Sequence, residues 1–97
     1  MMFRSSKIIK AAKHARCTRH GCLSAYSPVV ACHSNWHEHG KGRGLKAHDC
    51  FIAFMCQRCH DLIDGRVPGL TPEERKEQWR LAHDATILWL FMEGVIE

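Results

Sequence analysis

Four of the six cysteines in this 97-residue chain have a spacing that suits metal binding. They form two pairs, Cys17-x4-Cys22 and Cys56-x2-Cys59, that lie far apart in the sequence. Zn²⁺ prefers four soft ligands in a tetrahedron, and each short knuckle presents two thiolates to one ion. A chain this short also gains stability from a bound metal. We therefore expect a structural zinc site; the alternatives are small buried cysteines or a redox-active pair of Cys56 and Cys59.

The two other cysteines, Cys32 and Cys50, lie in apolar or strand-like contexts. Small buried thiols are common in protein cores. We expect both to be core residues rather than metal ligands.

A second group of polar residues remains once four cysteines are assigned to zinc. Its members suit a cation or a phosphate: His33, Asn35, Lys46, Asp49, His60, Asp61 and Asp64. His33 ends an expected strand, and His60 follows a zinc-ligating cysteine at an expected helix start. If the strands pair and the helix packs across them, the two histidines converge on one cleft. In such a cleft one histidine can deprotonate water while another side chain holds a divalent cation against a scissile phosphate.

Two strands and a short helix must position these groups. Residues 27–33 contain a Val-Val run with Pro28 near its start, which suits a buried strand. Residues 34–48 are rich in Gly and His and are expected to form a flexible loop. A returning strand is expected at 51–55, followed by a short helix at 58–63 that Gly65 ends.

The C-terminal segment predicts a longer helix. Thr71 is the expected N-cap, Pro72 occupies the first helical position, and Glu74 completes a capping box. Larger side chains then recur at helical spacing at Trp79, Ala82, Thr86, Trp89 and Leu90. Gly94 is the expected stop. This helix is expected to pack over the metal core.

Charge is divided unevenly along the chain. Residues 1–46 hold nine Lys and Arg against one acid, Glu38, for a net charge of +8. Residues 47–97 hold five Lys and Arg against nine acids, for a net charge of −4. A basic half next to an acidic half suits a polyanion on one side, although a solubilising tail before an amphipathic helix has the same pattern. We expect a basic N-terminal arm or helix at 1–16 and a zinc-bound domain at 17–97.

The composition is that of a globular chain, with 45% hydrophobic and 25% charged residues. No apolar run is long enough to span a membrane, and the N-terminus lacks the apolar segment and cleavage site of a secretory signal. We therefore expect no membrane association and a cytoplasmic location, where thiols stay reduced.

The combined motifs resemble the small prophage-encoded, YbcO-like family of HNH-type nucleases. The resemblance runs from about Lys10 to the C-terminus and depends on these segments: His33-Ser-Asn35, Gly40-Lys-Gly-Arg-Gly44, Lys46-Ala-His-Asp49, Cys56-x2-Cys59-His60-x2-Ile63-Asp64-Gly65 and Trp89-Leu-Phe-Met-Glu-Gly94-Val-Ile96. It implies a small α+β zinc-bound domain with a ββα-metal (HNH) core and a C-terminal packing helix. It also implies hydrolysis of phosphodiester bonds with Mg²⁺ or Mn²⁺, in the cytoplasm of a bacterial host cell.

The resemblance assigns roles residue by residue. His33 takes the position of the general base, and His60 that of a cation ligand. Asp49 either orients the base or binds the cation, and Asp64 is the other candidate carboxylate. Contacts to nucleic acid are implied for Lys41, Arg43, Lys46 and Asn35.

The sequence departs from the family at Cys32, where many HNH nucleases have an Asp that binds the cation. A thiol is a poor ligand for Mg²⁺, because hard cations prefer oxygen. Asp49 or Asp64 must therefore supply the missing carboxylate. The Cys17–Cys22 knuckle is also shorter than expected for the family.

The leading hypothesis is a metal-dependent DNA endonuclease that acts in phage or prophage DNA processing or recombination. Its partners would be DNA and a host or phage recombination protein. The alternative is a zinc-containing nucleic-acid-binding module without catalysis, which explains the basic half equally well. A third hypothesis, a structural zinc protein that binds other proteins through its terminal helix, leaves the Gly-Lys-Gly-Arg-Gly loop unexplained.

Overall fold

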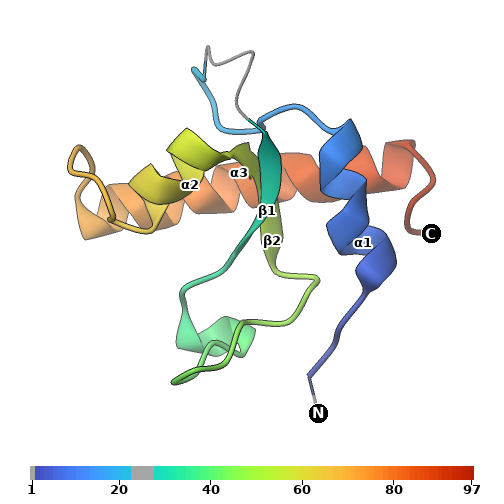
Figure 1. Ribbon diagram of the computed structural model, residues 1–97, viewed down its shortest axis with the longest axis horizontal. Coiled ribbons are helices and arrows are strands. Elements are labelled where there is room, and N and C mark those ends of the chain that lie inside the picture. The colour runs from blue at the N-terminus through green and yellow to red at the C-terminus, as the bar shows by residue number, and fades with distance from the viewer. Residues whose placement is uncertain (1, 23–27) are drawn as a thin grey trace.

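Two antiparallel strands and the helices around them form an α+β structure (Figure 1). This computed structural model describes residues 2–22 and 28–97. Its elements in chain order are α1 (Ser6–Lys10), the 3₁₀ helix η1 (Ala11–His14), β1 (Val29–His33), the 3₁₀ helix η2 (His37–His39), β2 (Ile52–Cys56), α2 (Gln57–Ile63) and α3 (Pro72–Met92). In Figure 1 the long helix α3 runs horizontally behind the sheet, with α2 on the left and α1 on the right.

The strands lie where the sequence predicts them, within one or two residues. They pair from Val29 opposite Cys56 to His33 opposite Ile52. Pro28 directly precedes β1, a position that needs no backbone donor in the ladder. Every residue of β2 is buried, because this strand lies between β1 and α3.

The two faces of the sheet pack against different partners. Neighbouring strand residues point to opposite faces, so Cys32 and His33 diverge. Cys32 belongs to a core cluster with residues of α2 and the first half of α3. On the other face, Ile52 and Phe54 pack against α1, η1 and the C-terminal half of α3. The basic N-terminal segment is therefore helical over part of its length and contributes Ile8 to the core.

Helix α3 begins and ends where its sequence predicts. Thr71 Oγ1 accepts from the Glu74 N–H, and the Glu74 carboxylate accepts from the Thr71 N–H, which completes the capping box. Pro72 is the first helical residue, and Gly94 has φ of +72° just beyond the helix. The buried face consists of Trp79, Ala82, Thr86 and Leu90, while Trp89 is half-buried beside it.

Hydrogen bonds with Thr86 and Thr18 satisfy the backbone groups of Phe54 on the edge of β2 that does not face β1. Thr86 Oγ1 accepts from the Phe54 N–H at 2.9 Å and donates to the Ala82 carbonyl at 2.8 Å. The backbone N–H of Thr18 donates to the Phe54 carbonyl at 2.8 Å, and so does its hydroxyl at 2.7 Å. Thr18 follows Cys17, so these bonds hold the first cysteine knuckle against the outer edge of β2.

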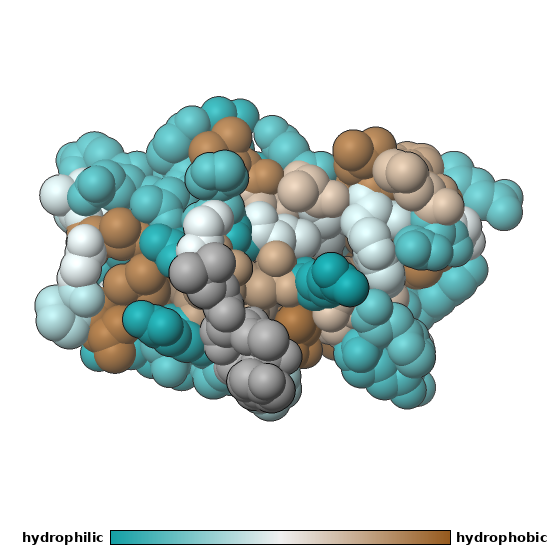
Figure 2. Space-filling model, turned by 90° about the horizontal axis from the view of Figure 1, so that it is seen from above, coloured by the Kyte–Doolittle hydropathy of each residue, from teal (hydrophilic) through white to brown (hydrophobic). Residues whose placement is uncertain are grey.

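Figure 2 shows hydrophobic residues in small separate groups among hydrophilic ones on the face seen from above. Across the described part of the chain, the large hydrophobic side chains that are exposed are Phe3, Leu45, Val67, Leu81, Leu88, Phe91 and Met92. Within that part, no helix combines the length and the apolar character needed to cross a membrane.

Candidate functional site

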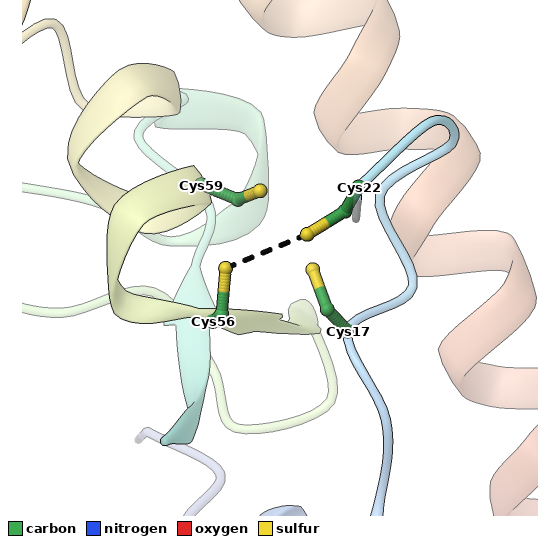
Figure 3. A group of neighbouring side chains, drawn as sticks. All are labelled: Cys17, Cys22, Cys56 and Cys59. Atoms are coloured by element: carbon green, nitrogen blue, oxygen red, sulfur yellow. Dashed lines mark hydrogen bonds between the residues drawn. The ribbon is translucent and has the colours of Figure 1, made fainter. Parts of the chain in front are cut away.

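The four expected zinc ligands converge at the junction of β2 and α2 (Figure 3). Cys56 ends β2 and Cys59 lies in the first turn of α2, while Cys17 and Cys22 come from the segment after η1. One sulfur from each residue lies within 4.8 Å of the others, and Cys22 Sγ is 3.7 Å from Cys56 Sγ. Four sulfurs converging from two knuckles form the donor set of a structural zinc site. The structure therefore confirms the predicted cysteine group as one that can hold zinc.

The cluster also places one thiol in an environment that favours the thiolate. Burial acts to raise the pKa of Cys56, but hydrogen bonds from the Cys59 backbone and from the neighbouring thiols lower the pKa to about 7. Burial raises the pKa of Cys59, whose sulfur accepts from Arg19 Nη1 at 3.8 Å. The thiolate is the form that binds metal, so Cys56 is the ligand that is most readily available.

His33 forms a pair with Asp49 at the end of β1. His33 Nε2 lies 2.8 Å from Asp49 Oδ1, and the Asp49 side chain is only 8% exposed. The other Asp49 oxygen accepts from the Ser5 N–H at 2.7 Å, and Arg4 Nη1 lies 3.1 Å from Oδ1. Burial acts to raise the pKa of Asp49, but the hydrogen bonds from His33, Ser5 and Arg4 outweigh it and lower that pKa.

These contacts define which nitrogen of His33 faces the carboxylate. An ionised carboxylate can only accept hydrogen bonds, so Nε2 of His33 is the donor. In the neutral imidazole Nδ1 then carries the lone pair, and it is the atom that can take a proton from a water molecule. Asp49 thus orients the imidazole and fixes its tautomer.

The N-terminal segment holds the loop that carries Asp49. Arg4 donates to the backbone carbonyls of Lys46 and Ala47. The Asp49 N–H donates to the Phe3 carbonyl at 2.9 Å, and the Phe3 N–H donates to His48 Nδ1 at 2.9 Å. The sequence reasoning missed these roles of the N-terminal residues, because nothing local to them indicates a partner more than 40 positions away.

A second possible metal group lies on the opposite face of the sheet. Cys32, His60 and Asp64 each place one ligand atom within 4.8 Å of the others. His60 and Asp64 are one turn apart on α2 and its C-cap, and His60 Nε2 is 3.0 Å from Asp64 Oδ2. Cys32 is fully buried, and burial followed by the charge of Asp64 raises the pKa of its thiol. Cys32 is thus a core residue, as expected, but one that also faces two candidate ligands.

An open pocket of about 380 Å³ lies beside this group. Asn35 and Asp64 line it together with the side chains of Arg66 and Arg75. Asn35 Nδ2 donates to Asp64 Oδ1 at 2.8 Å, which leaves Oδ2 toward His60. Burial acts to raise the pKa of Asp64, but the hydrogen bonds from His60 and Asn35 outweigh it and lower that pKa. Arg66 lies 3.6 Å from Asp61 and 3.7 Å from Asp64, so its charge is largely offset, whereas Arg75 forms no ion pair among the described residues. The sequence reasoning did not single out either arginine.

The expected polar group is thus divided between two clusters. Asp49 accompanies His33, Asp64 accompanies His60, and no hydrogen bond joins His33 to His60 among the residues that the structure describes. His33 also belongs to neither of the metal groups found there. The cause is the strand alternation, which sends the side chains of Cys32 and His33 to opposite faces.

The predicted nucleic-acid contacts lie on a tight turn. Gly42 and Leu45 form an isolated bridge with reciprocal backbone hydrogen bonds of 3.1 and 3.0 Å, so the expected loop contains an ordered turn. Arg43 and Lys46 are exposed and Lys41 is half-exposed. None of these three forms an ion pair within the described ranges, so their charges are available to an anion.

Comparison of the chain with protein-family models, with curated proteins and with solved structures finds no match to any of them. The described residues offer a four-sulfur metal group, an imidazole oriented by Asp49, and a Cys-His-Asp group beside a pocket that Arg66 and Arg75 help to line.

Proposed function

We propose that this chain is a metal-dependent DNA endonuclease of the HNH type, which hydrolyses phosphodiester bonds. The observation that carries the proposal is the His33–Asp49 pair, in which a carboxylate of lowered pKa accepts from Nε2 and leaves Nδ1 free. The order β1, β2 and α2 around the cysteine group supports the ββα-metal arrangement that the sequence resemblance implies. A role in phage or prophage DNA processing rests on that resemblance alone.

His33 would act as the general base. Its Nδ1 takes the proton of a water molecule as that water attacks the scissile phosphorus. The bond from phosphorus to the leaving sugar oxygen breaks, and that oxygen takes a proton from solvent. The Asp49 carboxylate stabilises the imidazolium that forms, since Asp49 Oδ1 already lies 2.8 Å from His33 Nε2. A positioned base of this kind contributes about 10²- to 10⁴-fold to a rate.

The substrate would be held through its phosphates. Arg43 and Lys46 are exposed on the turn that precedes Asp49, the partner of the base. Arg66 and Arg75 line the pocket beside Asp64. Contacts of this type depend on charge rather than on base sequence, so binding should weaken steeply with salt.

A divalent cation would be held by His60 and Asp64, on the helix after the zinc knuckle. When bound, such an ion would neutralise a DNA phosphate on the face of the sheet opposite His33, so it is not assigned to the phosphate that the base attacks. The Mg²⁺ that the resemblance implies does not fit the third member of the group, because Cys32 offers sulfur where Mg²⁺ requires oxygen. The proposal therefore assigns no step to Mg²⁺.

Plasmid nicking by zinc-loaded protein tests the proposal. We expect relaxation of supercoiled plasmid with an added divalent transition metal and none in the presence of EDTA at a concentration that leaves the four-sulfur site filled. Retention of DNA in a gel at low salt without nicking under any metal would instead support the non-catalytic binding module. Absence of both would contradict each of these functions.

A further inference from the structure

Cys32 lies together with His60 and Asp64 in a group that could bind a metal ion, although the sequence alone predicts Cys32 to be a core residue. All three residues place a donor atom within 4.8 Å of the others, so one ion can contact all of them. The group is built from two elements: β1 supplies the thiol, and α2 with its C-cap supplies the imidazole and the carboxylate. The Trp79 indole donates to the Cys32 carbonyl at 3.0 Å, which fixes the backbone behind the thiol.

The surroundings of the group resemble those of a prepared metal site. Asn35 holds one oxygen of Asp64 at 2.8 Å and leaves the other oxygen toward His60. The Gln57 side-chain nitrogen donates to Nδ1 of His60 at 3.3 Å, a contact that is given up when His60 Nε2 binds a metal. The bond from Asn35 to Asp64 is of the kind that orients a metal ligand and increases the affinity of a site.

The chemistry of the donors selects the class of ion. Sulfur and imidazole nitrogen favour Zn²⁺, Co²⁺ and Fe²⁺, whereas Mg²⁺ requires oxygen ligands in a near-octahedral array. One carboxylate next to a thiolate and an imidazole is a poor cage for Mg²⁺. We infer that Cys32, His60 and Asp64 form a second metal site that binds a thiophilic transition metal such as Zn²⁺ and rejects Mg²⁺.

Three protein ligands leave a coordination position open. Asp64 is the ligand that also lines the pocket of about 380 Å³, where Arg66 is paired with Asp61 and Asp64 and Arg75 forms no ion pair among the described residues. An exchangeable ligand would therefore enter from the pocket side. Catalytic zinc sites have this composition, with three protein ligands and one exchangeable position, while the four-sulfur group has the closed composition of a structural site. Only the use of this open position, which would be to bind a phosphate oxygen, rests on the proposed function.

Metal content, measured without DNA, tests the inference. Wild-type protein is equilibrated with buffered Zn²⁺ in a large molar excess of Mg²⁺, desalted and analysed by elemental mass spectrometry. We expect one zinc equivalent more in the wild type than in His60→Ala or in Cys32→Ala. Cys50→Ala is the matched control and keeps both equivalents, because Cys50 belongs to neither metal group in the described residues.

His60→Ala keeps the test decisive if removal of the buried Cys32 thiol unfolds the chain, since His60 is partly exposed. A Co²⁺-loaded sample adds a second readout, because thiolate-to-cobalt absorption must decrease in Cys32→Ala. A single zinc equivalent in folded wild type, or a second one that persists in both variants, would overturn the inference. Mg²⁺-dependent nicking with a single zinc would then leave the proposed function standing, while two zinc ions with no nicking would overturn only that function.

Discussion

Asp49→Asn tests whether the buried contacts of Asp49 stabilise the fold more than an exposed ion pair does. The carboxylate accepts from the Ser5 N–H at 2.7 Å and from His33 at 2.8 Å, in a side chain that is 8% exposed. A hydrogen bond to a charged group contributes about 1.5 to 3 kcal/mol. The Arg4 contact adds little, because that side chain is 41% exposed and solvent screens the pair.

Asparagine keeps one oxygen that can accept a hydrogen bond, but it replaces the other oxygen with an NH2 group. That group faces one of the two donors, Ser5 N–H or His33, so about one hydrogen bond to a charged group is lost. We expect the free energy of unfolding to fall by about 2 to 3 kcal/mol, which is a decrease in Tm of about 8 to 24 °C for a domain of this size. Calorimetry of the zinc-loaded protein at pH 7 measures this decrease in Tm. The control is Asp84→Asn, an equivalent change at an exposed ion pair with Arg80, which should stay within about 0.5 kcal/mol of wild type.

The contacts of Asp49 also predict how the stability of the protein depends on pH. The folded pKa of Asp49 lies below its usual value, so the ionised form favours folding. The stability difference between wild type and Asp49→Asn should be complete above the unfolded value of about 3.9 and should disappear as the pH falls through the lower folded pKa. Equal stability of Asp49→Asn and Asp84→Asn at pH 7 would refute the reasoning.

Two further substitutions test the frame that holds the site. Thr86→Val leaves the buried Phe54 N–H without its acceptor and should cost about 1 to 3 kcal/mol in urea denaturation, whereas Thr86→Ser keeps the hydroxyl and should cost less. Cys56→Ser should lose the structural zinc and the cooperative thermal transition, since zinc contributes about 10 to 16 kcal/mol in small zinc domains and total stabilities are about 5 to 15 kcal/mol. Cys50→Ser should keep both, and loss of the transition in that variant would contradict the assignment of ligands.

Local signals in the sequence were sufficient for the frame of the fold. Thr71, Pro72 and Glu74 define the start of α3 because a capping box needs only neighbouring residues. The spacing of the cysteine knuckles was similarly sufficient for the four-sulfur group, since each pair is formed within a short segment.

Features that depend on distant contacts could not be predicted in the same way. Arg4 and Asp49 are 45 positions apart, and no periodicity or motif links them. The sequence reasoning also expected His33 and His60 to share one cleft. The strand alternation instead turns Cys32 toward His60, and one step along the strand it turns His33 toward Asp49. The spacing of Cys32 and His33 contained this information, but only after β1 and its register were known.

The rate of plasmid nicking by His33→Ala, compared with His37→Ala, tests the central claim most directly. Both substitutions remove one imidazole, but His37 lies exposed in η2 and has no role in the proposed chemistry. With both proteins folded and zinc-loaded, the account predicts a loss of about 10²- to 10⁴-fold for His33→Ala and a rate close to wild type for His37→Ala. Nicking by His33→Ala at the wild-type rate would contradict the claim.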